Sequence, residues 1–488
     1  MGTITRSQQY RDEDYLRFTQ RLHEQLFLLK QQINSGQLDG GAHSIGAELE
    51  LYLVDQHCRP LGRNRELLAQ LNDPHLQLEL NRFNLEYNLP PRSLAGSVFS
   101  DYARETQEML RRLDKAANKL DGQVLAVGIL PTLRPEDFNG CMTDSPRYQA
   151  LADGLRRIRG EPFRVAIAGE QDQLETARED VALEGANTSW QLHLRVGAQQ
   201  FADWYNAIQL VTPLALAMAG NSPLLFGKRL WEETRVALFR QSIDSRSPER
   251  HEPWRQPARV SFGEGWLRDG AWELFASTVA LYPPILPECR DGATDQLSEL
   301  RLHAGTVWHW NRPVYDPVDG GHLRIEMRAL PAGPSALDMA ANSAFLIGAA
   351  AALLPRIREL ISALPFRYCE YNFVTAARQG LQARLLWPHQ DQIQLADRPV
   401  ADIILELLPA AARALEGLGI NSNEASAMQQ LLATRIEQRQ TGSSWLSRGY
   451  QRSDNGTDNA RQLMQLYHDL QIGGQPLHLW PSLPGQSS

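Results

Sequence analysis

The chain is poor in cysteine and in lysine, and each shortage excludes a class of site. Its 488 residues include four scattered cysteines with no C-x-x-C pair: Cys58, Cys141, Cys289 and Cys369. This spacing suggests neither a disulfide framework nor a thiolate zinc site, and it fits a reducing cytoplasm. Only four lysines occur and no G-x-x-x-x-G-K-S/T segment exists, which excludes a Walker-type nucleotide site. Any phosphate would therefore be held by arginine or by a metal ion.

Long apolar runs and an excess of positive charge are missing as well. No apolar stretch approaches the roughly 20 residues of a membrane-spanning helix. The opening segment, MGTITRSQQYRDEDY, lacks the apolar part of a signal peptide. The formal net charge is -8, which disfavours a nucleic-acid partner because backbone binding needs a basic face. We therefore expect a cytoplasmic protein that acts on small molecules and binds neither membrane nor nucleic acid.

Hydrophobic periodicity divides the chain into three parts. Residues 12–33 have the period of a helix. Strand-like segments then alternate with helical ones, at 44–54, at 76–93 until two prolines stop the pattern, and at 123–130, 188–196 and 322–330. From residue 335 to about 470 the pattern is helical almost throughout. This order predicts an α+β fold with an N-terminal helix in 1–40, a sheet-containing core in 41–334 and a helical C-terminal region in 335–488 packed on the core.

The predicted strand at 44–54 carries two glutamates on one side. Glu48, Glu50 and Tyr52 alternate with leucines, and alternation with a period of two marks a half-buried strand. Two positions along a strand are about 6.6 Å apart, so the like charges repel unless water or a cation intervenes. For one strand alone, a solvated sheet face is a sufficient explanation. Further carboxylates on other strands would favour a site.

The segment LQLELNRFNLEYN adds two glutamates whose parities differ. Glu79 lies on a polar face before Arg82, and Glu86 lies on the polar face of the residues that follow Phe83. A bulge or turn at this point would return Glu86 to the face of Glu79, and bulges often re-aim side chains beside active sites.

Two later strands add a histidine, a carboxylate and two arginines. In TSWQLHLRV, His193 shares a face with Arg195, and in HLRIEMRAL, Glu326 shares a face with Arg328. Together with the four glutamates above, sheet faces hold five carboxylates and one histidine. Such a set suits one or more hard divalent cations, because Mg²⁺ and Mn²⁺ prefer oxygen ligands and Mn²⁺ also accepts imidazole. These metal ions would bridge the phosphates of ATP, with Arg328 supplying a fixed guanidinium fork.

Several of these residues also have purely structural explanations. His193 alone is compatible with a hydrogen-bonded sheet histidine, and Glu326 with Arg328 is compatible with a surface ion pair. Arg235, in WEETRVALFR, either binds a substrate carboxylate or is a helix-surface charge paired with a neighbouring glutamate.

The aromatic residues before the last strand also allow two interpretations. Trp308, Trp310 and Tyr315 either stack on a base such as adenine or pack within a loop or an interface.

Taken together, these segments resemble the glutamate-cysteine ligases and related carboxylate-amine ligases, within the glutamine synthetase-like superfamily. Each motif is weak alone, but five of them follow in the family's order over residues 44 to about 350. They are G-x-E-x-E at 46–50, ELNRFNLEYN at 79–88, SWQLHLRV at 189–196, AMAGNSPLLFG at 217–227 followed by Arg235, and GHLRIEMRAL at 321–330.

The resemblance implies a cupped antiparallel sheet backed by helices, with 41–334 as a glutamine synthetase-like catalytic core. Two or three Mg²⁺ or Mn²⁺ ions would be held by Glu48, Glu50, Glu79, Glu86, His193 and Glu326. Arg328 would be catalytic and would bind the transferred phosphate, and Arg235 would bind the α-carboxylate of the donor. Arg195 stands where relatives often have a small polar residue, so it would contact the phosphate or the substrate.

The resemblance also implies an ATP-dependent ligase. A carboxylate, usually the γ-carboxylate of glutamate in this family, would attack the γ-phosphate of ATP, and an amine would then displace phosphate to form an amide. Glutamate-cysteine ligase is the simplest assignment, and another amine or amino acid is the alternative acceptor. Two other possibilities are a nucleotide- or metal-binding regulatory protein and a hydrolase with a dinuclear metal centre. A homodimer is the default assembly.

Overall fold

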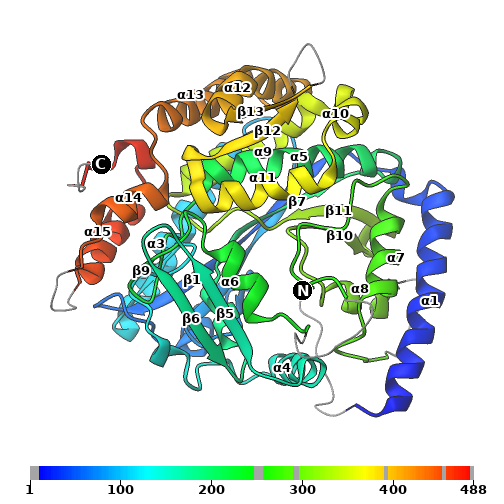
Figure 1. The fold of residues 1–488 in the computed structure, drawn as a ribbon, viewed down its shortest axis with the longest axis horizontal. Coiled ribbons are helices and arrows are strands. Elements are labelled where there is room, and N and C mark those ends of the chain that lie inside the picture. The colour runs from blue at the N-terminus through cyan, green and yellow to red at the C-terminus, as the bar shows by residue number, and fades with distance from the viewer. Residues whose placement is uncertain (1–9, 247–255, 290–295, 389–393, 453–457, 484–488) are drawn as a thin grey trace.

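A seven-stranded antiparallel sheet crosses the molecule in this computed structural model, which describes residues 10–246, 256–289, 296–388, 394–452 and 458–483 (Figure 1). Its strand order is β10-β11-β7-β1-β3-β2, and β4 pairs with one end of β1. The strands are β1 (Ser44–Asp55), β2 (Leu76–Leu78), β3 (Asn84–Ser93), β4 (Gly122–Leu125), β7 (Trp190–Arg195), β10 (Asn311–Asp316) and β11 (His322–Met327). The predicted α+β class, with an antiparallel sheet backed by helices, is confirmed.

One face of the sheet is apolar and packs against a layer of helices. Leu49 and Leu51 of β1 are fully buried, as the alternation in the sequence predicts. Trp190 of β7 donates a hydrogen bond from its indole Nε1 to Ser343 Oγ of α9 at 2.8 Å. The helices of this layer, at the top of Figure 1, are α5 (Phe201–Ala219), α9 (Ala336–Leu353), α11 (Phe366–Gln379), α12 (Val400–Gly417) and α13 (Ser422–Glu437). The polar side chains of the sheet therefore point away from these helices.

A second apolar cluster lies on the other side of the sheet, around one end of β1. Tyr52 follows Glu48 and Glu50 on the polar side of β1, and its ring stacks on Phe83 with centroids 6.1 Å apart. The surrounding elements are the hairpin β5 (Phe163–Ala168) with β6 (Gln173–Arg178), α6 (Arg235–Ser242), α14 (Gly442–Gly449) and α15 (Ala460–Gly473). The buried residues of α4 (Pro146–Arg159) belong to the main cluster instead. Apolar packing thus closes one end of the polar face.

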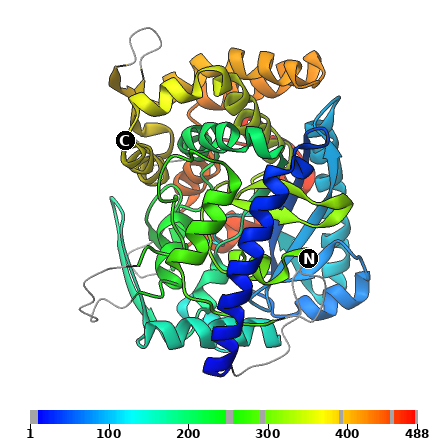
Figure 2. The ribbon, with the colours of Figure 1, turned by 90° about the vertical axis from the view of Figure 1, so that its right-hand side faces the viewer.

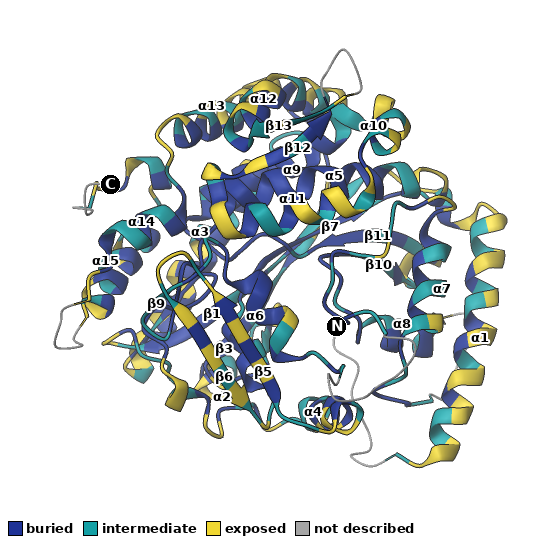
Figure 3. Cartoon of the chain, in the orientation of Figure 1, coloured by how far each residue is buried: buried dark blue, intermediate teal, exposed yellow. Residues whose placement is uncertain are grey.

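The helix predicted at 12–33 is α1 (Asp12–Asn34), which runs along one side of the molecule (Figure 2). Phe18, Leu22 and Leu29 are buried, and the helix packs on α7 (Ala271–Leu281) and α8 (Ser298–Ala304). Much of its other face is exposed (Figure 3). Short elements complete the described chain: α2 (Asn64–Leu71), β8 (Leu224–Leu225), β9 (Lys228–Arg229) and α10 (Ile357–Ala363). The division into three domains stays a prediction.

Strand β3 corrects one sequence expectation because it continues through the two prolines that follow Leu89. Its register with β1 shifts there, since Ala47 lies opposite Leu89 whereas Ile45 lies opposite Arg92. The additional residue of β3 forms a bulge, where the ladder of hydrogen bonds is already interrupted and proline is tolerated. The predicted end of the strand at the prolines was therefore wrong.

Three further expectations need correction. The strand expected at 123–130 is only β4, which ends at Leu125. The C-terminal region is not purely helical, because β12 (Arg384–Pro388) and β13 (Leu395–Pro399) form an antiparallel pair within it. The expectation that no apolar stretch approaches the length of a membrane-spanning helix is also corrected. Among the described residues, Ala336–Ala363 has the length and composition of such a helix, and 72% of its apolar window is buried in the fold. The segment begins with α9, which packs against α3 (Val98–Ala117), α5 and α12 as a core helix does.

Candidate active site

Strand register arranges polar side chains in rows across one face of the sheet. Glu48 of β1 lies opposite Gln191 of β7 on one side and Asn88 of β3 on the other. In the neighbouring row, Glu50 lies opposite Glu86. These carboxylates are partly accessible to solvent and yet surrounded by protein, as expected of side chains that line a concave surface.

The row on the other side of Glu48 contains Gly46, His193, Glu326 and Arg312, from β1, β7, β11 and β10. Because Gly46 has no side chain, the imidazole of His193 can approach the adjacent row. Its Nε2 lies 3.0 Å from Oε1 of Glu48.

Glu48, His193 and Glu326 form a group with the geometry of a metal site. Each offers one ligand atom, and the three atoms lie within 4.8 Å of one another. His193 is 6% exposed, and neither ring nitrogen has a hydrogen-bond partner in the described part of the chain. The contact with Glu48 has the distance of an ion pair without the angles of a hydrogen bond. The buried imidazole thus has an ion-pair contact with Glu48 but makes no hydrogen bond within the described residues, so the arrangement favours an external ligand.

Two arginines compensate the charge of Glu326, which is 1% exposed. Oε2 accepts a hydrogen bond from Arg312 Nε, and Oε1 accepts hydrogen bonds from Arg312 Nη2 at 3.1 Å and Arg328 Nη1 at 2.9 Å. Burial alone would raise the pKa of Glu326, but the charges of Arg312 and Arg328 outweigh it and hold the pKa far below its usual range. The carboxylate is therefore anionic, as a metal ligand must be.

Arg328 is positioned by its neighbours rather than extended into solvent. Nη1 donates to Gln191 Oε1 as well as to Glu326, whereas Nε is buried without a hydrogen-bond partner among the described residues. The predicted pairing of Glu326 with Arg328 is correct, but the pair is buried rather than on the surface.

Burial pushes the pKa of Glu48 upward, and the contact with His193 outweighs this effect and lowers it.

Glu50 is held by three hydrogen bonds. Its Oε2 accepts from the backbone N–H of Ser189 at 2.7 Å and from Ser189 Oγ at 2.8 Å, and Oε1 accepts from Gln191 Nε2 at 2.8 Å. Burial nevertheless raises the pKa of Glu50 above its ordinary value, although Arg328 and Ser189 act in the opposite direction. Its position is fixed while its charge is only partly compensated.

Glu79 and Glu86 meet because the chain turns between β2 and β3, which pair as a hairpin. This turn corresponds to the predicted break near Arg82. Burial and the repulsion of Glu50 raise the pKa of Glu79 to about 7. Burial and the repulsion of nearby glutamates, led by Glu48, raise the pKa of Glu86 well above its ordinary value, although Asn88 Nδ2 donates to its Oε1 at 2.8 Å.

Sequence analysis missed a sixth carboxylate beside this group. Glu184 lies in the 3-10 helix η4 (Ala182–Ala186), just before β7. Burial and the repulsion of Glu79 and Glu50 raise the pKa of Glu184 to about 8. Asn81 anchors η4 to the turn between β2 and β3, because its Nδ2 donates to the carbonyl of Ala182 at 2.8 Å. No periodic pattern in the sequence indicates this residue, since a short 3-10 helix has none.

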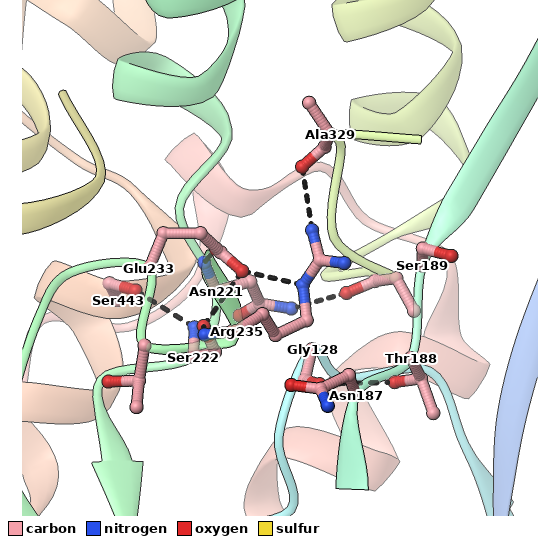
Figure 4. A network of polar contacts seen from close by, with 12 residues as sticks. Gly128, Asn187, Thr188, Ser189, Asn221, Ser222, Glu233, Arg235, Ala329 and Ser443 are labelled. Atoms are coloured by element: carbon pink, nitrogen blue, oxygen red, sulfur yellow. Dashed lines mark hydrogen bonds and ion pairs between the residues drawn. The ribbon is translucent and has the colours of Figure 1, made fainter. Parts of the chain in front are cut away.

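Arg235 lies inside the protein rather than on a helix surface, and it is 2% exposed. Its Nε donates to Glu233 Oε1 at 2.6 Å and its Nη2 donates to the carbonyl of Ala329 at 2.6 Å (Figure 4). The predicted partner, a neighbouring glutamate, is thus correct, and the predicted surface location is wrong. Arg235 is close enough to lower the pKa of Glu50. A contact with a substrate carboxylate stays a prediction.

Arg195 lies one row beyond His193, away from the acidic residues, and its Nη2 donates to the carbonyl of Gly40 at 3.1 Å. Of the aromatic residues considered for base stacking, Trp310 and Tyr315 are each 3% exposed. The ring of Trp310 contacts Phe239, Phe373 and the guanidinium of Arg235. These contacts favour internal packing for Trp310.

The donor set fits a hard divalent cation. It combines a buried imidazole without a hydrogen bond among the described residues, an anionic carboxylate held by arginines, and five further glutamates on the same face or beside it. Oxygen ligands with one imidazole are the preference of Mn²⁺ and are compatible with Mg²⁺. Arg328, with a buried unpartnered Nε, lies beside these ligands and fits an anionic group such as phosphate.

Comparisons with known proteins identify the family of the chain. Residues 44–461 match the family model described as Glutamate-cysteine ligase family 2 (GCS2). No protein with curated function matches the sequence significantly.

Two solved structures share the fold. The first is a glutamate-cysteine ligase from Francisella tularensis in complex with AMP, with 11% identity, coverage of 91% of both chains and a TM-score of 0.55. The second is a bifunctional glutathione synthetase from Pasteurella multocida, with 12% identity and a TM-score of 0.50, over 92% of this chain and 55% of that one.

Proposed function

The chain belongs to glutamate-cysteine ligase family 2, and from this membership we propose that it is an ATP-dependent carboxylate-amine ligase that joins glutamate to cysteine. The family supports the reaction class. The choice of substrates is our own proposal, and it rests on the family's description and on the likeness to a glutamate-cysteine ligase. Another amine is the alternative acceptor, because no residue described above selects a thiol. A cytoplasmic location and a homodimer stay predictions.

One observation carries the proposal: the buried imidazole of His193, which makes no hydrogen bond within the described residues, lies in one group with the carboxylates of Glu48 and Glu326 and close to Arg328. The ligands we assign to divalent cations are Glu48, Glu50, Glu79, Glu86, His193 and Glu326. When bound, Mg²⁺ or Mn²⁺ would neutralise the oxygens of the nucleotide phosphates. The protein's part is to keep these ligands in place, through the sheet register and through Arg312, Gln191 and Ser189.

In the first half-reaction, an oxygen of the donor carboxylate attacks the γ-phosphorus of ATP. The bond from this phosphorus to the bridging oxygen breaks, and ADP leaves with the electron pair. Arg328 is already held by Glu326 and Gln191, so it can stabilise the transferred phosphoryl group without reorganisation. Arg235, beside Glu50, is assigned to the donor's α-carboxylate.

In the second half-reaction, the amine attacks the acyl carbon, and the carbon–oxygen bond to phosphate breaks. The amine must lose a proton, which a carboxylate with a pKa near neutrality accepts effectively. We assign this role to Glu184, whose pKa of about 8 results from burial and from the repulsion of Glu79 and Glu50. Proximity and orientation then supply much of the rate.

The proposal is tested by ADP release with ATP and Mg²⁺ across a matrix of carboxylate donors and amine acceptors, with products identified by mass. Glutamate with cysteine should release ADP and yield a dipeptide. A different productive pair would keep the reaction class and replace the substrates. No release above the donor-free control would contradict the proposal, and water-dependent cleavage without ATP would indicate a hydrolase instead.

A further inference from the structure

Two arginines face each other one row beyond His193 and Glu326. Arg195 of β7 and Arg324 of β11 are direct antiparallel partners. Each is two residues from His193 or Glu326 on its strand, so both point to the polar face. Like charges directly opposite on neighbouring strands destabilise a sheet. An anion bound between the two guanidinium groups would remove this repulsion.

The protein satisfies these guanidinium groups only in part. Arg195 Nη2 donates to the carbonyl of Gly40 at 3.1 Å, and Arg324 Nη2 lies 3.3 Å from Asp316 Oδ2 of β10. The Nε of each arginine is buried and has no hydrogen-bond partner within the described ranges. The side chain of Arg324 is 28% exposed, so a ligand on the sheet face can reach it.

Positive and negative charges lie at opposite ends of the polar face. Near the arginine pair lie His322, whose Nδ1 makes no hydrogen bond in the described chain, and the carboxylate of Asp316. The opposite end of the face holds Glu50, Glu86 and their acidic neighbours. A polyanion therefore fits the arginine end, and an ammonium group fits the acidic end.

We propose that Arg195 and Arg324 form a guanidinium pair that binds the non-transferred phosphates of the nucleotide. The inference rests on the proposed ATP-dependent reaction and deepens it. Arg324 and Arg328 are four residues apart and lie on the same face, so their Cα atoms are about 13 Å apart. Their long side chains can converge on a phosphate chain that runs between them, with the γ-phosphate at Arg328. The nucleotide then lies towards Arg324 and the amine enters over the glutamates.

Binding of a nucleotide series to the full-length protein with Mg²⁺ tests the pair by calorimetry. Arg195→Gln and Arg324→Gln should each weaken ATP and ADP binding about tenfold to a hundredfold, because a charge-assisted hydrogen bond is lost. Adenosine should bind both variants as it binds the wild type. Arg324→Lys should retain part of the affinity for ATP, and tripolyphosphate should lose affinity in parallel with ATP.

Asp316 supplies the sharper comparison. If Arg324 serves an external phosphate, Asp316→Asn removes a competing anion and should strengthen ATP binding. If Arg324 serves only its ion pair, Asp316→Asn and Arg324→Gln should lower the melting temperature alike and leave nucleotide affinity unchanged, which would overturn the inference. Arg384→Gln, at the exposed first residue of β12 and paired with Asp397, is the matched control for the loss of one surface arginine.

The outcomes separate this inference from the proposed function. A wild-type protein that binds no nucleotide overturns both. Amide formation with ATP affinity untouched in both glutamine variants overturns only the arginine pair. A loss of affinity for the carboxylate donor instead of ATP also overturns it, because the pair would then serve the other substrate.

Discussion

The two ends of the polar sheet face hold carboxylates in opposite electrostatic states. Glu326 accepts hydrogen bonds from Arg312 and Arg328, and its pKa is held far below the ordinary range because these charges outweigh burial. At the other end, burial and mutual repulsion raise the pKa of Glu79 to about 7 and that of Glu184 to about 8. The same residue type is therefore stabilised as an anion at one end and destabilised at the other.

The difference shows where the protein depends on an external cation. The Glu326 end carries its own counter-charge, so its geometry is set before any ligand binds. The acidic end concentrates negative charge with little internal compensation, and such charge is unfavourable in a poorly solvated site. Metal ions or the ammonium group of an acceptor would supply the missing charge there. We therefore expect variants of the two ends to differ in stability, in pH dependence and in their response to Mg²⁺.

The largest effect is expected for Glu326→Gln. This change leaves Arg312 and Arg328 without their anion, so the free energy of unfolding should fall by about 3–5 kcal/mol. Misplacement of Arg328 should also lower kcat by roughly 10²–10³-fold. Urea unfolding and steady-state kinetics measure both effects. Glu359→Gln on α10, where the carboxylate is exposed and pairs with Arg356 just before the helix, is the matched control. Wild-type stability in Glu326→Gln would contradict the internal compensation inferred here.

The same substitution at the acidic end should have the opposite effect on stability. Glu184→Gln removes one of the repelling charges, so the metal-free protein should gain about 1 kcal/mol or less at pH 8. If Glu184 accepts the proton of the amine, kcat should fall about 10²-fold. Thermal unfolding without Mg²⁺ and turnover with it separate the two roles. A destabilised metal-free variant would show that Glu184 is compensated by the protein after all.

The pH dependence of stability should distinguish the ends without mutation. A carboxylate with a raised pKa binds more protons in the folded state than in the unfolded state between its unfolded and folded pKa values. With pKa values of about 7 for Glu79 and about 8 for Glu184, both raised by burial and repulsion, metal-free stability should fall as pH rises from about 6.5 to 8.5. Burial lowers the pKa of His303 to about 4, whereas burial and the repulsion of Glu170 raise the pKa of Glu232 to about 7 and, against burial, Asp114 raises that of His468, so the contribution of the acidic end is the part of the slope that Glu184→Gln removes.

Addition of Mg²⁺ should oppose this loss, and its stabilising effect should grow with pH because bound ligands must be deprotonated. Unfolding curves at several pH values, with and without Mg²⁺, measure the difference. Glu184→Gln should flatten the metal-free slope, whereas the exposed control Glu359→Gln should leave it unchanged. A metal-free stability that rises across this window would refute the uncompensated state of the acidic end.

Much of the sheet face was predictable because a local pattern determines it. Once the leucines of β1 and Trp190 of β7 pack under the helices, an exact period of two places Glu48, Glu50 and His193 on the opposite side. The change of parity near Arg82 likewise indicated the turn that joins β2 to β3. These signals need no knowledge of the neighbouring strands. The catalytic and metal-binding roles of the residues stay predictions.

The compensating residues were not predictable from local pattern. Arg312 lies on β10, an edge strand with a proline at its centre, and only the strand order places it opposite Glu326. Glu184 comes from a 3-10 helix whose position depends on the contact of Asn81 with Ala182. A helix-surface position was one of the two interpretations of Arg235, and the sequence did not reveal its burial because this depends on Glu233 and Ala329, which the fold brings together. Charge compensation is thus a tertiary property, and it separates the two ends of the site.

The smallest effect is expected at an ion pair between two helices, outside the group of acidic residues. His468 of α15 contacts Asp114 of α3, with Nε2 and Oδ1 2.8 Å apart. Burial would lower the pKa of His468, but the hydrogen bond and charge of Asp114 outweigh it and raise the pKa above its ordinary value. The pair therefore stabilises the fold fully below the unfolded pKa of about 6.5 and loses this contribution as pH rises through the folded pKa.

His468→Gln should lower the free energy of unfolding by about 1 kcal/mol at pH 6 and by less at pH 9. Mg²⁺ should not change this difference, because Asp114 supplies the counter-charge from within the protein. Unfolding of the variant and the wild type at both pH values, with and without Mg²⁺, gives the comparison. A Mg²⁺-dependent difference at His468 would mean that metal binding stabilises the whole fold rather than the acidic end of the sheet. The contrast between the two ends would then no longer explain the metal response.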